Sequence, residues 1–449
     1  MKLKNIAALA MLVSCWQLNV WAQCETEPRP EKTGKILKEL KINRAELPEA
    51  AEIVLQIKAS APGTSWQKKN AEAPVLTVFV DGKYSGDVIL FAGEESFDYK
   101  MLLGKLTAGE HQITVVLNEA RSAPNARQVK VSSLKAIAAN KLVTKKSQFD
   151  AIAIANAPVI YARPNTIDKF SDIPLLTYYE IFDDAENIKK IRYTVIFTNE
   201  DGGTQSAALM ARWGRMTDIE WIYEIPVRAT GEIVSEIYQA AFHQTKPFTG
   251  KRIGTHPLIL DATDNNNFAD AGCSALRLAP MLIFADLSIA SRETVMDANP
   301  WTYRIMAEEA VREGRVDPKN LGANTIDDLR SYLFVETRSE SVNAKVSLEL
   351  NDSESNKSAS DFGDERLRVD RPGYFRIAVR LPNATGKLKE IVVRCHAASA
   401  ATVNGVCQNA SIIKIWRLDQ NFTPREVAFE TRPVANLKQN ESLSYKIKN

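Results

Sequence analysis

Short stretches in which hydrophobic and polar residues alternate recur along most of the chain, and this period of two is the pattern of half-buried β-strands. Near the amino terminus, residues 75–80 lead into a turn at 81–83, and the strand pattern resumes at 87–91. An Asp-Gly turn between two such stretches predicts a β-hairpin. Residues 111–117 alternate in the same way. We therefore predict an N-terminal β-sandwich over residues 36–140.

The middle of the chain combines strand patterns with a helical one. Apolar positions in residues 303–314 repeat with helical spacing and are followed by a proline, which predicts an α-helix. Thr325 is expected to cap a second, shorter helix over 327–333. Residues 233–243 fit either a helical face or a strand, and we favour the strand. Further strands are predicted at residues 158–163, 175–181, 191–198, 207–213 and 220–227.

These patterns divide the chain into three modules. The middle module, residues 150–331, is the largest and carries the helices, and residues 332–449 form a C-terminal β domain. The fold class is therefore mostly β and multi-domain, with β-sandwich modules flanking a larger β-rich (α+β) middle domain. The strands predicted in the C-terminal domain are 342–350, 373–381, 389–396 and 411–418.

The first residues have the pattern of a secretion signal. Two lysines precede a short apolar run with small residues before Gln23, which predicts a signal peptide over 1–22 and a Pro-rich, charged, disordered leader over 23–35. The residues that end at Cys15 also match a bacterial lipobox, so a lipid anchor at Cys15 is the alternative. We predict a secreted or periplasmic protein, or one anchored at the outer surface. No later segment is apolar enough to span a membrane.

Composition narrows the partners and the compartment. The formal net charge is +2, which argues against nucleic acid as a partner because proteins that bind it present a basic face. Cysteine usage fits an oxidising compartment. Cys395 and Cys407 flank a turn of small residues, so we predict a disulfide that closes this hairpin, and Cys24 with Cys273 is a second candidate pairing.

Candidate chemistry concentrates between residues 199 and 301, where charged residues stand close to tryptophans. A ligand site is built from fixed polar groups beside apolar walls. Aromatic faces also bind sugar rings through apolar contact, although core packing is the alternative for these indoles. The ligand-binding candidates are Arg212, Trp213, Arg215, Trp221 and Trp301.

Asp218 and Glu220 stand two residues apart, which on a strand directs both carboxylates to the same side. Such a pair can hold a divalent cation, or it can divide into a general acid and a general base when the two environments differ. The alternative is a solvated strand face on which Arg212 and Arg215 serve as ion-pair partners.

His256 is one of four histidines and lies shortly before Asp261 and Asp264, which suits a hydrolytic metal or a general base. A histidine that caps a strand end is the alternative. Residues 264–272 place oxygen ligands at alternate positions but lack the glycine and glutamate of an EF-hand, which leaves an irregular calcium site or a plain Asx-rich turn. The predicted ligands for Ca²⁺ or Mg²⁺ are Asp218, Glu220, His256, Asp261 and Asp264.

The order of Asp218-Ile219-Glu220-Trp221, a strand, Thr255-His256-Pro257 and an Asp-rich loop is similar to the β-sandwich of necrosis-inducing toxins and their vacuolar-sorting-like relatives. The resemblance covers about residues 193–272. Those proteins have an Asp-Trp-Glu strand and a later Ser-His turn around a divalent cation, whereas here no histidine precedes the aspartate and the tryptophan follows the glutamate. The resemblance implies Asp218, Glu220 and His256 as cation ligands and a lipid- or glycan-facing role.

The leading hypothesis is a secreted or cell-surface protein that binds an extracellular polysaccharide or surface glycan through its middle domain, with a divalent cation as a candidate cofactor. The second hypothesis is an extracellular hydrolase in which His256 or Asp218 is the catalytic base. The third is a structural or adhesion protein without a small ligand, in which the polar middle region is a buried ion-pair network. The first two hypotheses expect the acids, the imidazole and the indoles to surround one cavity.

Overall fold

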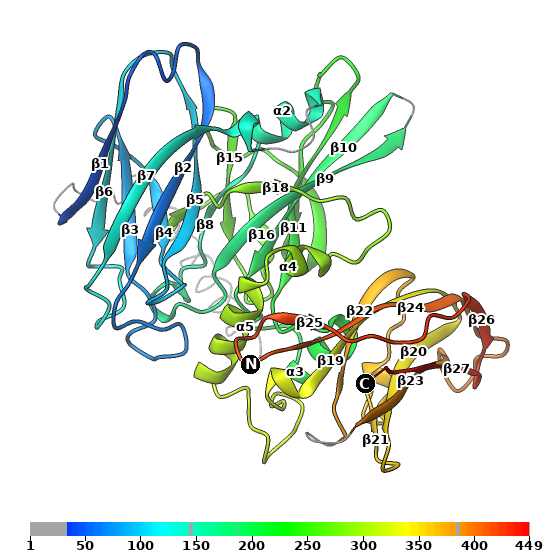
Figure 1. Ribbon diagram of the computed structural model, residues 1–449. Helices are drawn as coiled ribbons and strands as arrows, with labels where there is room; N and C mark the ends of the chain where they lie inside the picture. Colours follow the sequence, from blue (N-terminus) through cyan, green and yellow to red (C-terminus); the bar gives the residue numbers. More distant parts are fainter. Residues whose placement is uncertain (1–33, 143–146, 186, 383–386, 449) are drawn as a thin grey trace, which may run out of the picture. The chain divides into compact units, whose positions relative to one another are not determined.

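The computed structural model describes residues 34–142, 147–185, 187–382 and 387–448, and the protein is mostly β, as predicted (Figure 1). The predicted signal peptide, Cys15 and the proposed pairing of Cys24 with Cys273 lie outside the described residues. Among the helices that the structure describes, none is both long and apolar enough to cross a membrane.

The chain divides into two compact units. The first unit contains the residues up to Asp201 together with Ile219–Ala285, and the second contains Gly202–Asp218 and the residues from Asp286 onward. The segment that was predicted as one middle domain therefore contributes to both units.

The amino-terminal part of the first unit consists of two sheets that enclose a hydrophobic core. One sheet begins β1-β6-β3-β4, and the other has the order β5-β2-β7. Leu55 and Ile57 on β2 and Leu76 and Val78 on β3 alternate with polar or outward-facing residues and are buried in the shared core. The strands are β1 (Ile36–Ile42), β2 (Ala51–Ser60), β3 (Val75–Val80), β4 (Lys83–Ile89), β5 (Phe97–Leu106), β6 (His111–Asn118) and β7 (Lys130–Ala138).

The first sheet continues into the rest of the unit through β17, which pairs with β4 on one edge and with β8 on the other. Helix α2 (Gln148–Ala155) begins at Ser147, which forms a capping box with Asp150. The later strands are β8 (Val159–Tyr161), β9 (Pro174–Ala185), β10 (Ile188–Phe197), β11 (Ile219–Arg228), β12 (Ile237–Ala240), β13 (Gln244–Pro247), β14 (Arg252–Ile253), β15 (His256–Asp261), β16 (Phe268–Ala269), β17 (Arg277–Leu278) and β18 (Leu282–Phe284).

The second unit contains helices α3 (Ser206–Trp213), α4 (Thr294–Ala298) and α5 (Trp301–Arg312) and a sandwich of two sheets around its own core. One sheet has the order β22-β19-β24-β25, with β26 also on β24, and the other has the order β21-β20-β23-β27. The strands are β19 (Tyr332–Val342), β20 (Ala344–Asp352), β21 (Lys357–Ala359), β22 (Gly373–Arg380), β23 (Leu388–Ala397), β24 (Val406–Leu418), β25 (Pro424–Glu426), β26 (Ala435–Lys438) and β27 (Ser442–Lys446).

The segment predicted as a strand at 207–213 is a helix, α3. Its Ala, Leu, Met and Arg residues are good helix formers, and the helix buries Leu209 and Met210 before it ends at Gly214, whose φ of 59° is left-handed. The short helix expected at 327–333 is one 3₁₀ turn over Leu329–Ser331. Its cap is Asp328 rather than Thr325.

The disulfide between Cys395 and Cys407 is present, as predicted, and it is buried, but it does not close a hairpin. Cys395 lies on β23 and Cys407 lies on β24, and these consecutive strands belong to opposite sheets of the sandwich. Two strands joined by a short connection give the same sequence pattern whether they pair in one hairpin or belong to opposite sheets. The spacing of the cysteines therefore could not distinguish these two arrangements.

Candidate functional site

Glu220 lies near the start of β11, and its carboxylate has two polar neighbours on β12 and the turn after it. Gln239 donates a hydrogen bond to Glu220 Oε2 over 2.6 Å, and His243 Nδ1 lies 3.9 Å from the same oxygen. Asp218 lies just before β11 and belongs to the other unit. Trp221 points to the opposite face of β11, where Arg192 lies 5.5 Å from its ring.

The turn over Ala241–His243 presents Phe242 and His243 at the surface. Both residues have left-handed backbone conformations, with φ of 61° and 55°, which non-glycine residues rarely adopt. Phe242 is 88% exposed, although it is a large hydrophobic residue. Its backbone N–H donates to Asn267 Oδ1 over 3.0 Å. Strained conformations of this kind concentrate at functional sites.

The Asp-rich loop between β15 and β16 holds the imidazole of His243 from two sides. The amide nitrogen of Asn265 lies 3.0 Å from Nε2, and the amide nitrogen of Asn267 lies 3.3 Å from Nδ1. The loop thus brings two asparagines to the histidine, and Glu220 on β11 lies near Nδ1, the ring nitrogen that Asn267 also approaches. We call the group formed by Glu220, Phe242, His243, Asn265 and Asn267 the His243 surface.

A buried arginine, Arg163, also holds this loop in place. Arg163 binds Asp201 at 2.6 Å and Asp172 at 3.2 Å, and it donates to the Thr263 carbonyl at 3.0 Å. Its guanidinium also lies 3.4 Å from Asp264, one of the predicted metal ligands. Asp264 is therefore an ion-pair partner of Arg163, the residue that holds the loop in place. Charged hydrogen bonds of this kind hold a loop in one conformation.

His256 and Asp261 mark the two ends of β15, and the strand keeps them apart. Five residues of strand span about 16 Å, and an odd separation directs the side chains to opposite faces. His256 Nδ1 lies 2.9 Å from the Ala157 carbonyl, and Nε2 lies 3.1 Å from Glu52 Oε2. Asp261 is buried where β15 enters the Asp-rich loop. The imidazole near Glu220 is that of His243, which was not among the predicted site residues.

Five predicted site residues lie in the second unit: Arg212, Trp213, Arg215, Asp218 and Trp301. Arg215 is buried and pairs with Glu293 at 3.0 Å, and Asp218 lies 4.0 Å from the same guanidinium. Burial alone would raise the pKa of Glu293, but the charge of Arg215 and those of further arginines lower it to about 2. This part of the polar region is an ion-pair network.

Arg212 and Trp213 lie at the edge of this ion-pair network. Arg212 donates to Asp370 over 2.9 Å and stacks 4.8 Å from the centre of the Trp213 ring. The guanidinium of Arg371 lies 5.3 Å from the same ring, so the indole is stacked against two cations. Trp301 is the first residue of α5 and is half-buried.

The predicted metal ligands do not form one cluster. In the part of the chain that the structure describes, none of the five belongs to a set of three or more His, Cys or acidic side chains whose ligand atoms lie within 4.8 Å of one another. Glu220 contacts His243, Asp264 contacts Arg163, and His256 contacts Glu52. The Asx-rich character of residues 261–267 and the selection of Glu220 were the sequence signals that pointed to the His243 surface.

No protein-family model and no curated protein sequence matches this chain. The resemblance to necrosis-inducing toxins therefore stays a prediction. The His243 surface combines an exposed aromatic ring, a carboxylate, an imidazole and two side-chain amides.

Proposed function

We propose that the protein binds an extracellular glycan or glycan-like ligand at the His243 surface. The observation that supports the proposal is the 88% exposure of Phe242 directly beside fixed hydrogen-bonding groups. A sugar ring offers an apolar face of C–H groups and a rim of hydroxyls. An aromatic ring next to carboxylate and amide groups matches both features.

The strain in the turn supports the same proposal. A left-handed non-glycine residue costs about 1–3 kcal/mol and persists only where its surroundings hold it. Here the Asn267 hydrogen bond to Phe242 and the pairing of β12 with β13 hold the turn. A surface prepared in this way loses little conformational entropy when it binds a ligand.

Substitution of Phe242 tests the proposal. On a panel of soluble polysaccharides followed by affinity electrophoresis, Phe242→Ala should weaken the best ligand at least about tenfold, which corresponds to 1.4 kcal/mol. The matched control is Phe362→Ala in the second unit, because Phe362 is also exposed and also has a left-handed backbone. Equal retardation of the Phe242→Ala variant and the unaltered protein would contradict the proposal.

A hydrolase at the same surface is the second candidate, and the contact between Glu220 and His243 at 3.9 Å is the observation that favours it. A carboxylate beside an imidazole can move a proton to or from a bound ligand. In this case Glu220→Gln should abolish product formation from a polysaccharide that the variant still binds. Retained turnover in Glu220→Gln would remove Glu220 as the acid or base.

A divalent cation extends the binding proposal, because Glu220 and the loop amides offer the oxygen ligands that Ca²⁺ and Mg²⁺ prefer. A cation bound to the folded protein raises the melting temperature through linkage. We expect Ca²⁺ to raise the melting temperature and Glu220→Gln to remove this increase. An increase that survives the substitution would place the ion elsewhere.

A further inference from the structure

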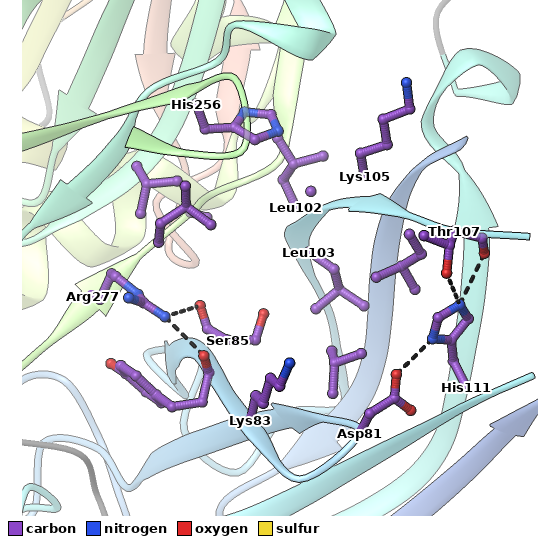
Figure 2. A pocket seen from close by; sticks show the side chains of 17 residues that line it. Asp81, Lys83, Ser85, Leu102, Leu103, Lys105, Thr107, His111, His256 and Arg277 are labelled. Atoms are coloured by element: carbon purple, nitrogen blue, oxygen red, sulfur yellow. Dashed lines mark hydrogen bonds and ion pairs between the residues drawn. The ribbon is translucent and has the colours of Figure 1, made fainter. Parts of the chain in front are cut away.

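A cavity of about 330 Å³ lies in the first unit, at the place where β17 joins the amino-terminal sheet to the later strands (Figure 2). Its walls come from the β3–β4 hairpin, the end of β5, the strand β17 and the start of β15. The volume is at the lower end of the range for ligand pockets, which suits a ligand about the size of one sugar ring. The His243 surface contributes none of its lining residues.

The charged side chains of the cavity wall are mostly cationic. Lys83, Lys105 and Arg277 line it, and Asp81 is the one acidic residue in the wall. Asp81 already accepts hydrogen bonds from the His111 ring at 2.7 Å and from the Gln112 backbone at 2.8 Å. Within the described residues, neither lysine forms an ion pair. The wall therefore carries positive charge that its own acid does not neutralise.

A β-bulge places Lys105 in the wall. In the pairing of β2 with β5, Val54 is opposite Leu102, but the preceding residue Ile53 is opposite Gly104, so Leu103 is the extra residue. Gly104 has φ of 85°, a conformation that favours glycine. The bulge turns Leu102 and Lys105 to the same face of the strand, although they are three residues apart. Without the bulge, Lys105 would face the opposite side.

Two imidazoles complete the wall. His111 binds Asp81 and the Thr107 carbonyl at 2.9 Å, and Figure 2 shows both contacts. Burial alone would lower the pKa of His111, but these two partners raise it above its ordinary value. His256 lies against Gly104, and Glu52 is its charged neighbour. If Glu52 is counted with the wall, the permanent cations still outnumber the acids.

Arg277 fixes one side of the cavity. It donates hydrogen bonds to the carbonyls of Tyr84 and Ser85, each over 3.0 Å, and stacks 4.3 Å from the Tyr84 ring. Its backbone N–H donates to the buried carboxyl of Asp87. The apolar part of the wall is formed by Val80, Leu102, Leu103, Val159 and Ala279.

We propose that this cavity binds a small organic oxyanion, a carboxylate or a phosphate monoester on a body the size of one sugar ring. In Figure 2 the side chains of Lys83 and Lys105 point apart, so both would turn toward the anion when it binds, and the leucine and valine side chains would contact the body. The electrostatic attraction between an anion and two ammonium groups is stronger beside a partly apolar wall than in open solvent, because the local dielectric constant is lower. This site is separate from the glycan surface and does not rest on that proposal.

Calorimetric titration with three probes tests the inference. D-glucuronate carries a carboxylate, glucose 6-phosphate carries a phosphate, and glucose is the neutral control. We expect at least one of the two anions to bind at least tenfold more tightly than glucose. The comparison between the two anions identifies which oxyanion the cavity prefers. Equal binding of all three, or no binding of either anion at millimolar concentration, would overturn the proposal.

The double variant Lys83→Gln/Lys105→Gln should weaken anion binding at least tenfold while leaving the melting temperature unchanged. The control is Lys100→Gln, because Lys100 is an exposed lysine on the same strand that does not line the cavity. Phe242→Ala should leave this binding unchanged, which separates the two proposals. Anion binding that is equal in the double variant and in Lys100→Gln would contradict the role of the two lysines.

The affinity should also fall as the pH rises through the pKa of His111, because the raised pKa means that the ring is cationic below that point and neutral above it. The charged groups that face this ring or its partner are Asp81 and Lys83. His111→Gln should flatten the pH profile. An unchanged profile in that variant would exclude His111 from the site.

Discussion

At the scale of single residues, the buried charges of the second unit depend on complete pairing. Arg376 is fully buried and binds Asp297 at 2.8 Å and Glu336 at 3.3 Å, and its guanidinium stacks 4.0 Å from the Trp416 ring. Each of these carboxylates lies in or at the edge of the protein interior. A buried charge that loses its partner destabilises the folded state far more than an exposed one does.

We therefore expect Arg376→Ala to lower the free energy of unfolding by about 3–5 kcal/mol, because it leaves Glu336 buried without its cation. The control is Arg366→Ala, which removes an exposed ion pair with Asp364 and should change the free energy of unfolding far less. Urea denaturation of both variants measures the difference. Similar midpoints for the two would show that the buried network contributes little.

The choice of histidine also belongs to this scale. Sequence proximity favoured His256, because two aspartates follow it within eight residues. The intervening residues form a strand, which carries Asp261 away from His256, whereas His243 reaches the Asp-rich loop through a turn. The sequence indicated that a histidine and acidic residues would lie close together. Which imidazole meets which carboxylate depended on the long-range pairing between β12 and β16.

At the scale of elements, most strands were predictable because alternation records a half-buried face. The strands β9, β10 and β11 lie where the pattern placed them. Helix α3 was predicted wrongly because its short apolar stretch fits a strand as well as a helix, and only its packing against the rest of the second unit distinguishes the two. The bulge at Leu103 left no signal beyond a glycine.

The disulfide is the element-scale feature with the clearest energetic consequence. It joins residues 12 apart in the sequence and links the two sheets of the second unit. Cross-linking a loop of this length stabilises a fold by about 3 kcal/mol in the chain-entropy account. The double variant Cys395→Ala/Cys407→Ala should lose about this amount in a denaturant titration. A loss below about 1 kcal/mol would mean that the sandwich core alone holds the sheets.

At the scale of the whole molecule, the segment that was predicted to carry one site is divided between two units. Arg212, Arg215 and Asp218 belong to the second unit, and Glu220, His256 and Asp264 belong to the first. A segment dense in polar residues can form buried ion pairs, a binding surface or both. The density alone does not show that these residues meet at one site. The cationic cavity was missed for the complementary reason, because its lysines, arginine and histidines come from distant segments.

The shared sheet of the first unit has a practical consequence for anyone who shortens this protein. Because β17 is hydrogen-bonded to both β4 and β8, and because Val54 and Leu102 belong to the same core cluster as Ile160 and Tyr193, a chain cut after Leu142 would leave unpaired strand edges and bare apolar side chains on both fragments. Each half expressed alone should accumulate as insoluble aggregate, and mixing the two halves during refolding should recover soluble material.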